Sequence, residues 1–260
     1  MLEINEPTGI LRKYIKNYCI VEINNSMDYM PYERVFPHGN VTLVFHYGLP
    51  SKFKKKKSNE YIESSLVICG QQTGYYDLSL SGKTGMILII FKPHGIKPFF
   101  NLPINDLQNK NLSMSDLIKN EAIELEEKLF NSKNNKQRII QLEKFLIKRL
   151  STDNDSERIE HAIKLIENSK GLLKSKVVAQ ELCLGIKQFE RIFSKHVGLN
   201  PKKFASVIRF QNVIRMKMNN ENANMYQLAF DNGYYDQSHF IHDIKNITGL
   251  SPRKFFNDRK

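Results

Sequence analysis

The feature that most constrains the fold is a repeat near the carboxyl end of the chain. The stretch FERIFSKHVGLNPKKF at 189–204 matches FIHDIKNITGLSPRKF at 240–255, and both contain Gly-Leu-x-Pro-x-Lys-Phe at a displacement of 51 residues. Just upstream, VAQELC at 178–183 matches LAFDNG at 228–233 at a displacement of 50. The second copy therefore has one additional residue in its turn, and the two copies are expected to fold alike.

Each copy has the spacing of a helix-turn-helix unit. A small residue near the middle of the first helix, Ala179 or Ala229, lets two helices cross closely, and Gly233 permits a left-handed turn in the second copy. Helical periodicity places Phe189 and Phe240 on the inward side of the second helix of each copy. The sequence therefore predicts two similar units in series.

Single residues suggest where several helices begin. Ser175 is expected to cap the first helix of the first copy, and Asn224, with Gln227, that of the second copy. Pro201 stands where the first residue of a helix is often proline, so a long helix is expected to start there and join the two copies. Tyr234 is expected to pack beside the second turn, together with its neighbour Tyr235.

The outward faces of the two second helices carry donors, acceptors and cations. In the first copy these are Lys187, Gln188, Arg191 and Lys195, and in the second copy they are Ser238, His239, His242 and Lys245. Side chains at this spacing can reach base edges and phosphates in a major groove, and two such helices on one linker helix can enter successive grooves roughly 34 Å apart. The pair His239 and His242 is less well explained as a metal site, because no third ligand stands nearby.

The charge of the chain is distributed unevenly. The formal net charge is +12 over 260 residues. Residues 158–260 contain 18 Lys and Arg against 9 Asp and Glu, which gives +9. This asymmetry suits a module that binds a polyanion.

The amino-terminal region has a different pattern. Up to about residue 100, short runs such as VTLVFHY and GMILIIFK alternate with Gly, Pro and Asn clusters, which is typical of strands and turns. We therefore expect an α+β chain with three parts: a β-rich sensor domain, a cupin-like barrel or sandwich, over 1–120; a helical connector over 121–156 that can mediate dimerisation; and an all-α DNA-binding domain over 157–260. The polar stretch STDNDSER at 151–158 marks the linker.

Composition excludes several classes of protein. No apolar run approaches the roughly 20 residues needed to span a bilayer, and the first twenty residues do not have the pattern of a secretory signal. The scattered cysteines Cys19, Cys69 and Cys183 suggest reduced thiols. We therefore expect a cytoplasmic protein with no membrane partner.

With these residues the chain resembles the AraC/XylS-type bacterial transcription regulators. The resemblance covers about residues 157–257 and is most specific in LAFDNGYYDQSHFIHDIKNITGLSPRKF. It implies recognition helices at 186–196 and 237–246, double-stranded DNA as the partner, and contact with RNA polymerase. The DNA-binding residues predicted from the resemblance and from the outward faces are Lys187, Gln188, Glu190, Arg191, Lys195, Arg209, Gln237, Ser238, His239, Ile241, His242, Lys245, Arg253 and Lys254.

Four residues depart from the family pattern. Cys183 stands where glycine is common, and Gly185 where a serine cap is usual. His242 replaces the usual arginine and Ile244 the usual phenylalanine. A neutral histidine makes fewer contacts than a forked guanidinium, so the second unit is expected to bind DNA less tightly or to read a different base.

A second hypothesis is a cupin-type enzyme, dependent on a metal or a small molecule, with a DNA-binding appendage. The segments FPHGN (36–40) and KPHGI (92–96) share Pro-His-Gly, and His38, His46 and His94 are candidate metal ligands. However, the paired His-x-His and Glu of metal cupins are absent, and turn formation explains both segments better. No nucleophile with a base, phosphate-binding glycine loop or carboxylate pair has informative spacing. We therefore expect no enzyme activity, no catalytic residue, no metal and no cofactor.

The amino-terminal region resembles one AraC-type subgroup, but less closely than residues 157–257 resemble the family. A DNA-binding domain of about 100 residues does not need an additional amino-terminal region of about 150 residues to bind DNA alone. This region is therefore expected to bind a small-molecule effector in its apolar interior or to form a homodimer through 121–150. The identity of an effector, the operator and the direction of the transcriptional effect, activation or repression, do not follow from the residues.

Overall fold

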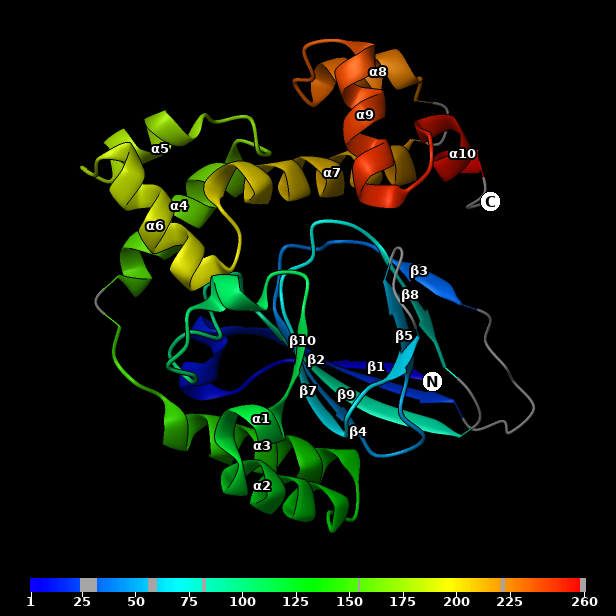
Figure 1. Ribbon diagram of the computed structural model, residues 1–260, viewed down its shortest axis with the longest axis vertical. Coiled ribbons are helices and arrows are strands. Elements are labelled where there is room, and N and C mark those ends of the chain that lie inside the picture. Colours follow the sequence, from blue (N-terminus) through cyan, green and yellow to red (C-terminus); the bar gives the residue numbers. More distant parts are fainter. Residues whose placement is uncertain (24–31, 56–59, 81–82, 154, 221–222, 258–260) are drawn as a thin grey trace.

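The computed structural model describes residues 1–260 except 24–31, 56–59, 81–82, 154, 221–222 and 258–260. Along the long axis the chain forms three layers, with α1–α3 at one end, the strands in the middle and the helices from α4 onward at the other end (Figure 1). No helix within the described residues is both long and apolar enough to cross a bilayer.

The described strands form two antiparallel sheets. The larger sheet has the order β1-β2-β9-β4-β7-β10. Its strands are β1 Leu2–Asn5, β2 Ile15–Ile23, β9 Thr84–Phe91, β4 Thr42–His46, β7 Leu66–Cys69 and β10 Asn111–Ser113. The smaller sheet, ordered β3-β8-β5-β6, consists of β3 Glu33–Val35, β8 Tyr76–Ser79, β5 Lys52–Lys55 and β6 Tyr61–Ile62. The predicted β-rich amino-terminal fold is confirmed, as two antiparallel sheets.

One face of the larger sheet packs against helices. Side chains alternate along β4, so that Leu43 and Phe45 join the main core while Val44 joins a small cluster on the opposite face. Leu142 and Leu146 belong to the same main core as Leu43. The covering helices, which follow two 3₁₀ turns at Gly9–Lys13 (η1) and Ile104–Leu107 (η2), are α1 Met114–Ile118, α2 Asn120–Phe130 and α3 Asn135–Arg149. Because α2 and α3 share a core with the sheet, they belong structurally to the β-rich part.

The described elements after α3 are all helices, and they reproduce the repeat. Their bounds are α4 Ser156–Asn168, α5 Ser175–Glu181, α6 Ile186–Val197, α7 Pro201–Asn219, α8 Met225–Asp231, α9 Gln237–Thr248 and α10 Pro252–Asn257. The first helices of the two units start 50 residues apart and their second helices start 51 apart, as the aligned segments predict. α4 begins two residues before the end of the polar stretch that was expected to be linker.

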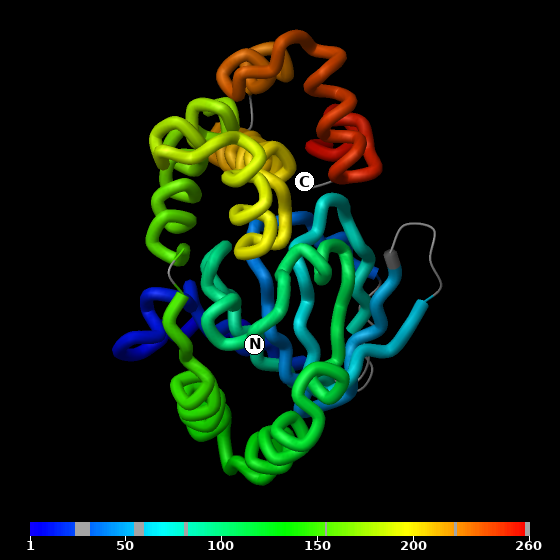
Figure 2. The backbone as a smooth tube through the Cα atoms, turned by 60° about the vertical axis from the view of Figure 1, so that its left-hand side comes forward, coloured from blue at the N-terminus to red at the C-terminus, as the bar shows by residue number. Residues whose placement is uncertain are grey.

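A single helix, α7, holds both units. Its first half places Phe204 and Val207 in a core with Phe189 and Phe193 of α6. Its second half places Phe210 and Val213 in a separate core with Phe240 of α9 and Phe255 of α10. Figures 1 and 2 show α6 and α9 near opposite ends of α7, both running toward the β-rich part. The two units therefore have separate hydrophobic cores and are joined by one helix, α7.

Both repeated Gly-Leu turns pack on the β-rich part. The turn after α9 is bound by the backbone N–H of Tyr75, which donates to the Ile247 carbonyl oxygen at 2.9 Å. Gly249 has a φ of +76°, and a Cβ there would lie only 2.4 Å from the Tyr75 ring. A Cβ on Gly198, after α6, would lie 3.0 Å from Ile104 and 3.3 Å from Gln71. Glycine thus serves both the left-handed turn and the close approach.

Candidate nucleic-acid interface

Helix α6 exposes the face that was predicted to contact DNA. Phe189 and Phe193 on its inner side are completely buried. All five predicted contact residues lie on the exposed side: Lys187, Gln188, Glu190, Arg191 and Lys195. Among the residues that the structure describes, the three cations of this face have no ion-pair partner. They are therefore available to phosphate without first breaking an internal contact.

The turn before α6 has the same geometry as the turn before α9. In the first unit the Leu184 N–H donates to the Ala179 carbonyl oxygen at 2.9 Å, and in the second the Tyr234 N–H donates to that of Ala229 at 3.1 Å. The left-handed residue is Gly233 in the second unit, with a φ of +64°, but Cys183 in the first, with a φ of +53°. The fold thus keeps this turn even where the sequence departs from glycine.

Helix α9 exposes a less charged face. Its N-cap is Asp236, whose side chain accepts from the His239 N–H at 2.7 Å. The predicted contact residues of this helix are exposed, except Gln237, which is half-buried; the exposed ones are Ser238, His239, Ile241, His242 and Lys245. The His242 ring accepts from the Asn246 amide at 3.1 Å. This face offers neutral donors and acceptors, with Lys245 as its one cation among the predicted contact residues.

Arg209 lies between the two units on α7. It is half-buried, and its guanidinium lies 5.2 Å from the centre of the Tyr234 ring. Tyr234 in turn packs edge-on against the His239 ring, with 5.4 Å between centroids. Arg209 is therefore placed to support α9 through Tyr234. By contrast, Arg253 and Lys254 are exposed on α10.

Sequence reasoning missed Asp243, which fixes α9 to its surroundings. Its carboxylate accepts from the Ser206 hydroxyl of α7 at 3.2 Å and from the Tyr234 hydroxyl at 3.2 Å. Burial and this neighbouring carboxylate raise the pKa of Tyr234, so the phenol remains a donor. An acidic residue inside an otherwise basic or neutral helix face was the available signal. The prediction that Tyr235 packs was wrong, because that residue is 93% exposed.

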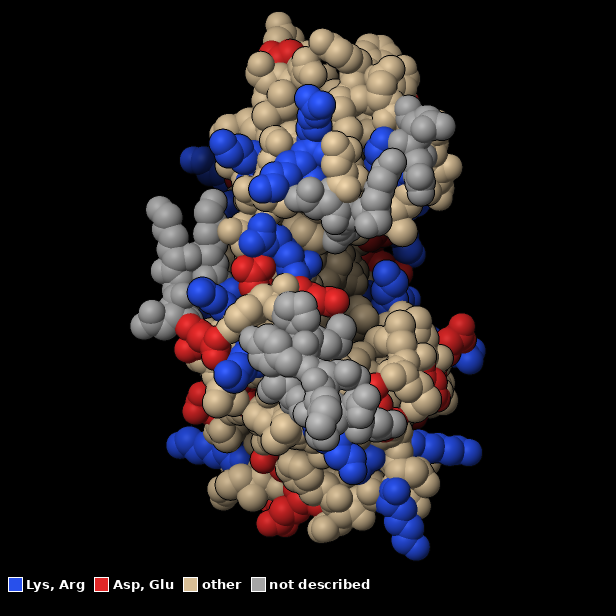
Figure 3. All heavy atoms as spheres, turned by 90° about the vertical axis from the view of Figure 1, so that its right-hand side faces the viewer, with Lys and Arg blue, Asp and Glu red and all other residues tan. Residues whose placement is uncertain are grey.

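The surface charge agrees with the asymmetry in the sequence. On the face shown in Figure 3, the carboxy-terminal region at the top carries Lys and Arg with few Asp and Glu, whereas the β-rich region below mixes both signs. Such a distribution favours a polyanion at the helical end of the molecule.

The histidines of the amino-terminal region do not form the cluster that the enzyme hypothesis needs. Within the described residues, no three His, Cys, Asp or Glu side chains come together in a group that could hold a metal. His46 is buried and lies 3.2 Å from the Glu63 carboxylate, and His38 is exposed. The hypothetical cluster of His38, His46 and His94 is therefore not supported.

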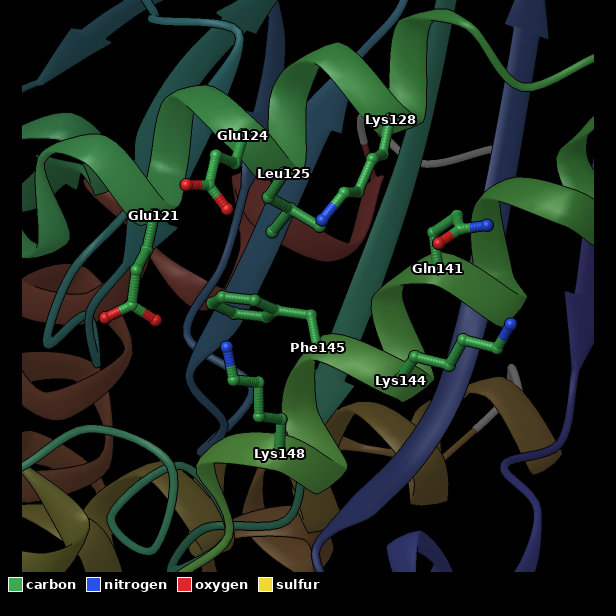
Figure 4. Close-up of a pocket in the computed structure, with 8 residues that line it drawn as sticks. All are labelled: Glu121, Glu124, Leu125, Lys128, Gln141, Lys144, Phe145 and Lys148. Atoms are coloured by element: carbon green, nitrogen blue, oxygen red, sulfur yellow. The ribbon is translucent and has the colours of Figure 1, made fainter.

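The groove between α2 and α3 is the second surface that the sequence singled out. It has a volume of about 200 Å³, and Lys128, Lys144 and Lys148 line it together with Glu121 and Glu124 (Figure 4). Nearby apolar side chains on the same helices are exposed, namely Ile123, Phe130, Ile140 and Ile147. The dimerisation role of these helices stays a prediction.

Comparisons with known proteins agree with this division of the chain. A family model described as a helix-turn-helix domain matches residues 178–258, and one described as a domain of unknown function (DUF6597) matches residues 4–113. These ranges coincide with the two helical units and with the two sheets.

Two curated relatives are similar over part of the chain. The HTH-type transcriptional regulator ArgR of Pseudomonas aeruginosa is 24% identical over 132 residues, which cover 45% of this chain and 40% of that protein. An uncharacterized HTH-type transcriptional regulator of Haemophilus influenzae is 30% identical over 67 residues, which cover 26% of this chain and 22% of that protein. The chain thus spans less than half the length of either relative.

Among solved structures, ToxT from Vibrio cholerae is similar in chain arrangement. The match covers 92% of this chain and 97% of ToxT, with 13% identity and a TM-score of 0.45.

Proposed function

We propose that this chain, whose carboxy-terminal part is an AraC-type helix-turn-helix domain, is a sequence-specific DNA-binding transcription regulator. The resemblance to the AraC/XylS-type regulators is confirmed over this region. The observation that carries the proposal is the pair of helix-turn-helix units with matching helix lengths on α7. Each presents its polar face to solvent rather than to the other unit.

The exposed faces of α6 and α9 are proposed to contact DNA in different ways. Lys187, Arg191 and Lys195 on α6 supply charge for phosphates and for guanine edges, and the neutral residues of α9 read bases through hydrogen bonds. Exposed cations on α10 would add phosphate contacts that set register but carry no sequence information. This predicts that affinity falls steeply with salt while sequence preference survives.

Other parts of the proposal concern partners and location. A regulator of this kind works in the compartment that holds the DNA, so we also propose a cytoplasmic location. RNA polymerase would be contacted from the carboxy-terminal region, a second copy of the chain through α2 and α3, and a small-molecule effector through the amino-terminal region. The effector proposal is supported by the packing of the amino-terminal region on both Gly-Leu turns, which belong to the two helix-turn-helix units.

The test is selection of bound duplexes from a random pool by the full chain, followed by competition at fixed salt. A specific regulator binds the selected duplex at least about a thousandfold more tightly than random DNA. Equal affinity for both would reject the proposal in favour of a nonspecific architectural binder. Purified protein with one metal per chain and turnover of a small substrate would instead revive the enzyme hypothesis.

A further inference from the structure

The two Pro-His-Gly segments lie at the same end of the larger sheet. The segment 36–40 precedes β4 and the segment 92–96 follows β9, and these strands pair antiparallel. β2 pairs with β9 on its other side, where Ile15 lies opposite Phe91. Lys16 of β2 therefore stands beside the second Pro-His-Gly turn. Sheet topology thus collects residues that are far apart in the sequence.

A cavity of about 380 Å³ lies between this end of the sheet and helix α4. The β-rich part contributes Lys16, Lys92 and His94, and α4 contributes Glu160, Lys164 and Glu167. The Lys164 ammonium already pairs with Glu160 at 2.8 Å.

The charges of Lys16 and Lys92 are uncompensated at short range. In the described part of the chain neither ammonium has an ion-pair partner within 4 Å. Burial raises the pKa of Glu167 on α4, and the charges of Lys16 and Lys92, which line the same cavity, oppose that rise. Two cations that line one cavity without a short ion pair favour an added anion.

His94 is the most unusual group in this cavity. It is only 3% exposed, yet neither ring nitrogen has a hydrogen-bond partner within the described residues. Its Nε2 lies 3.9 Å from the Glu160 carboxylate, which is beyond hydrogen-bond length. Burial lowers the pKa of His94 to about 4, so near pH 7 the ring is neutral with one donor and one acceptor. Buried polar groups are nearly always paired, and this one borders a cavity large enough for a ligand.

We infer that this cavity binds a small organic anion whose carboxylate or phosphate lies between Lys16 and Lys92 and is hydrogen-bonded to His94. Its volume falls within the range of about 300–1,000 Å³ that is usual for small-molecule sites. Glu160 and Glu167 on the opposite wall favour a ligand that also carries hydroxyl or amino donors. The site therefore selects for a small hydroxy or amino acid, or a phosphorylated equivalent, over a purely apolar acid.

A ligand here contacts both parts of the chain. One wall belongs to the β-rich part and the other to α4, whose Ile159 and Ile163 share a core with Phe189 of the first recognition helix. Binding would hold α4 in its docked position. The binding itself does not depend on DNA recognition, whereas its regulatory effect rests on the proposed function.

The first experiment measures thermal unfolding of the full chain with four probes at constant ionic strength: inorganic phosphate, malate, 3-phosphoglycerate and glucose. At about 10 mM, an anion that occupies the site raises the Tm by at least about 2 °C, and glucose does not. A response to malate but not to inorganic phosphate identifies carboxylate chemistry, and a response to inorganic phosphate but not to malate identifies phosphate chemistry.

A matched pair of variants separates this site from general salt effects. Lys16→Gln/Lys92→Gln removes two charges from the cavity, and Lys144→Gln/Lys148→Gln removes two from the α2–α3 groove (Figure 4). The Tm shift is expected to disappear in the first variant and to persist in the second. A shift that persists in the first, or disappears only in the second, overturns the inference.

A second measurement does not depend on any variant. The side-chain ¹⁵N resonances of His94 are followed while 3-phosphoglycerate is added to the labelled full chain. A bound anion moves them because one ring nitrogen gains a hydrogen bond. Unchanged resonances and an unchanged Tm with all three anions would overturn the inference. Specific DNA binding by the ligand-free chain would leave the proposed function intact in that case.

Discussion

The two helix-turn-helix units have the same backbone plan but differ in how they are fixed and in what they expose. The first unit has a cysteine in its left-handed turn and an N-cap glycine that makes no side-chain hydrogen bond. The second has glycine in that turn and the Asp236 cap, and Asp243 adds hydrogen bonds to α7. The exposed face of α6 is cationic and that of α9 is mostly neutral. The better capped helix thus carries the neutral face that is proposed to read bases, whereas the less well capped helix carries the cationic face.

The largest effects are expected from the cores of the two units. Phe189→Ala and Phe240→Ala each remove a completely buried ring, so each should lower the free energy of unfolding by about 3–5 kcal/mol. Because the two rings belong to separate clusters, the losses should add within about 0.5 kcal/mol in the double variant. Denaturant unfolding measures both. Phe230→Ala, at a side chain 80% exposed, is the control and should have almost no effect.

The next effect separates the two exposed faces. Arg191→Ala should weaken binding to the selected duplex by about 1–3 kcal/mol, and His242→Ala by about 0.5–1.5 kcal/mol, since a neutral hydrogen bond is weaker than a forked cationic one. Titration of labelled duplex at two salt concentrations gives both values. Lys54→Ala, at an exposed residue of β5, is the control and should bind normally. A larger loss for His242→Ala than for Arg191→Ala would reverse the assignment of roles.

A smaller effect concerns the caps. Asp236→Ala removes the side chain that accepts from the His239 N–H, so it should lower stability by about 1 kcal/mol. The reciprocal change Gly185→Ser gives the first unit a side-chain cap and should raise stability by a few tenths of a kcal/mol. Thermal unfolding of the two variants checks the signs. Equal and opposite changes of about 1 kcal/mol would mean that Gly185 costs more than its geometry indicates.

The smallest effect is expected at the left-handed turn. Cys183→Gly relieves a non-glycine residue held at a φ of +53°, and the gain, partly offset by the greater freedom of glycine in the unfolded chain, should be up to about 1 kcal/mol. Gly233→Ala makes the matched change in the other direction, at a φ of +64°, and should destabilise. Stabilisation by Gly233→Ala would show that the two turns are not equivalent.

Much of the helical half was predictable because its determinants are local. The repeat gave the displacement of 50 and 51 residues, and Asn224 caps α8 by accepting from the Gln227 N–H at 2.7 Å, as expected. Ser175 does not act as a cap, because the helix already includes it and Lys174 stands at the N-cap position. Helical periodicity also favours the inward side of α6 for Ile186, but this first residue of the helix is 39% exposed. At a terminus the neighbouring turn, and not the helical phase, decides burial.

The arrangement of the domains could not be predicted from the sequence. The contact of Tyr75 with Ile247 and the cavity around His94 join residues that lie far apart along the chain. Neither has a spacing that a pattern can reveal. In the KPHGI segment, turn formation explained the motif in the sequence, but only the packing of α4 gave its histidine a cavity.

The most direct test of the central claim uses the spacing of the two recognition sites on DNA. The selected duplex is redesigned with about 5 bp inserted between its two half-sites. This insertion turns the second major groove to the opposite face of the DNA. With both units fixed on α7, affinity of the full chain should fall at least about a hundredfold, and an insertion of about 10 bp should not restore it. Unchanged affinity after the 5 bp insertion would show that the two units do not bind one face of DNA together.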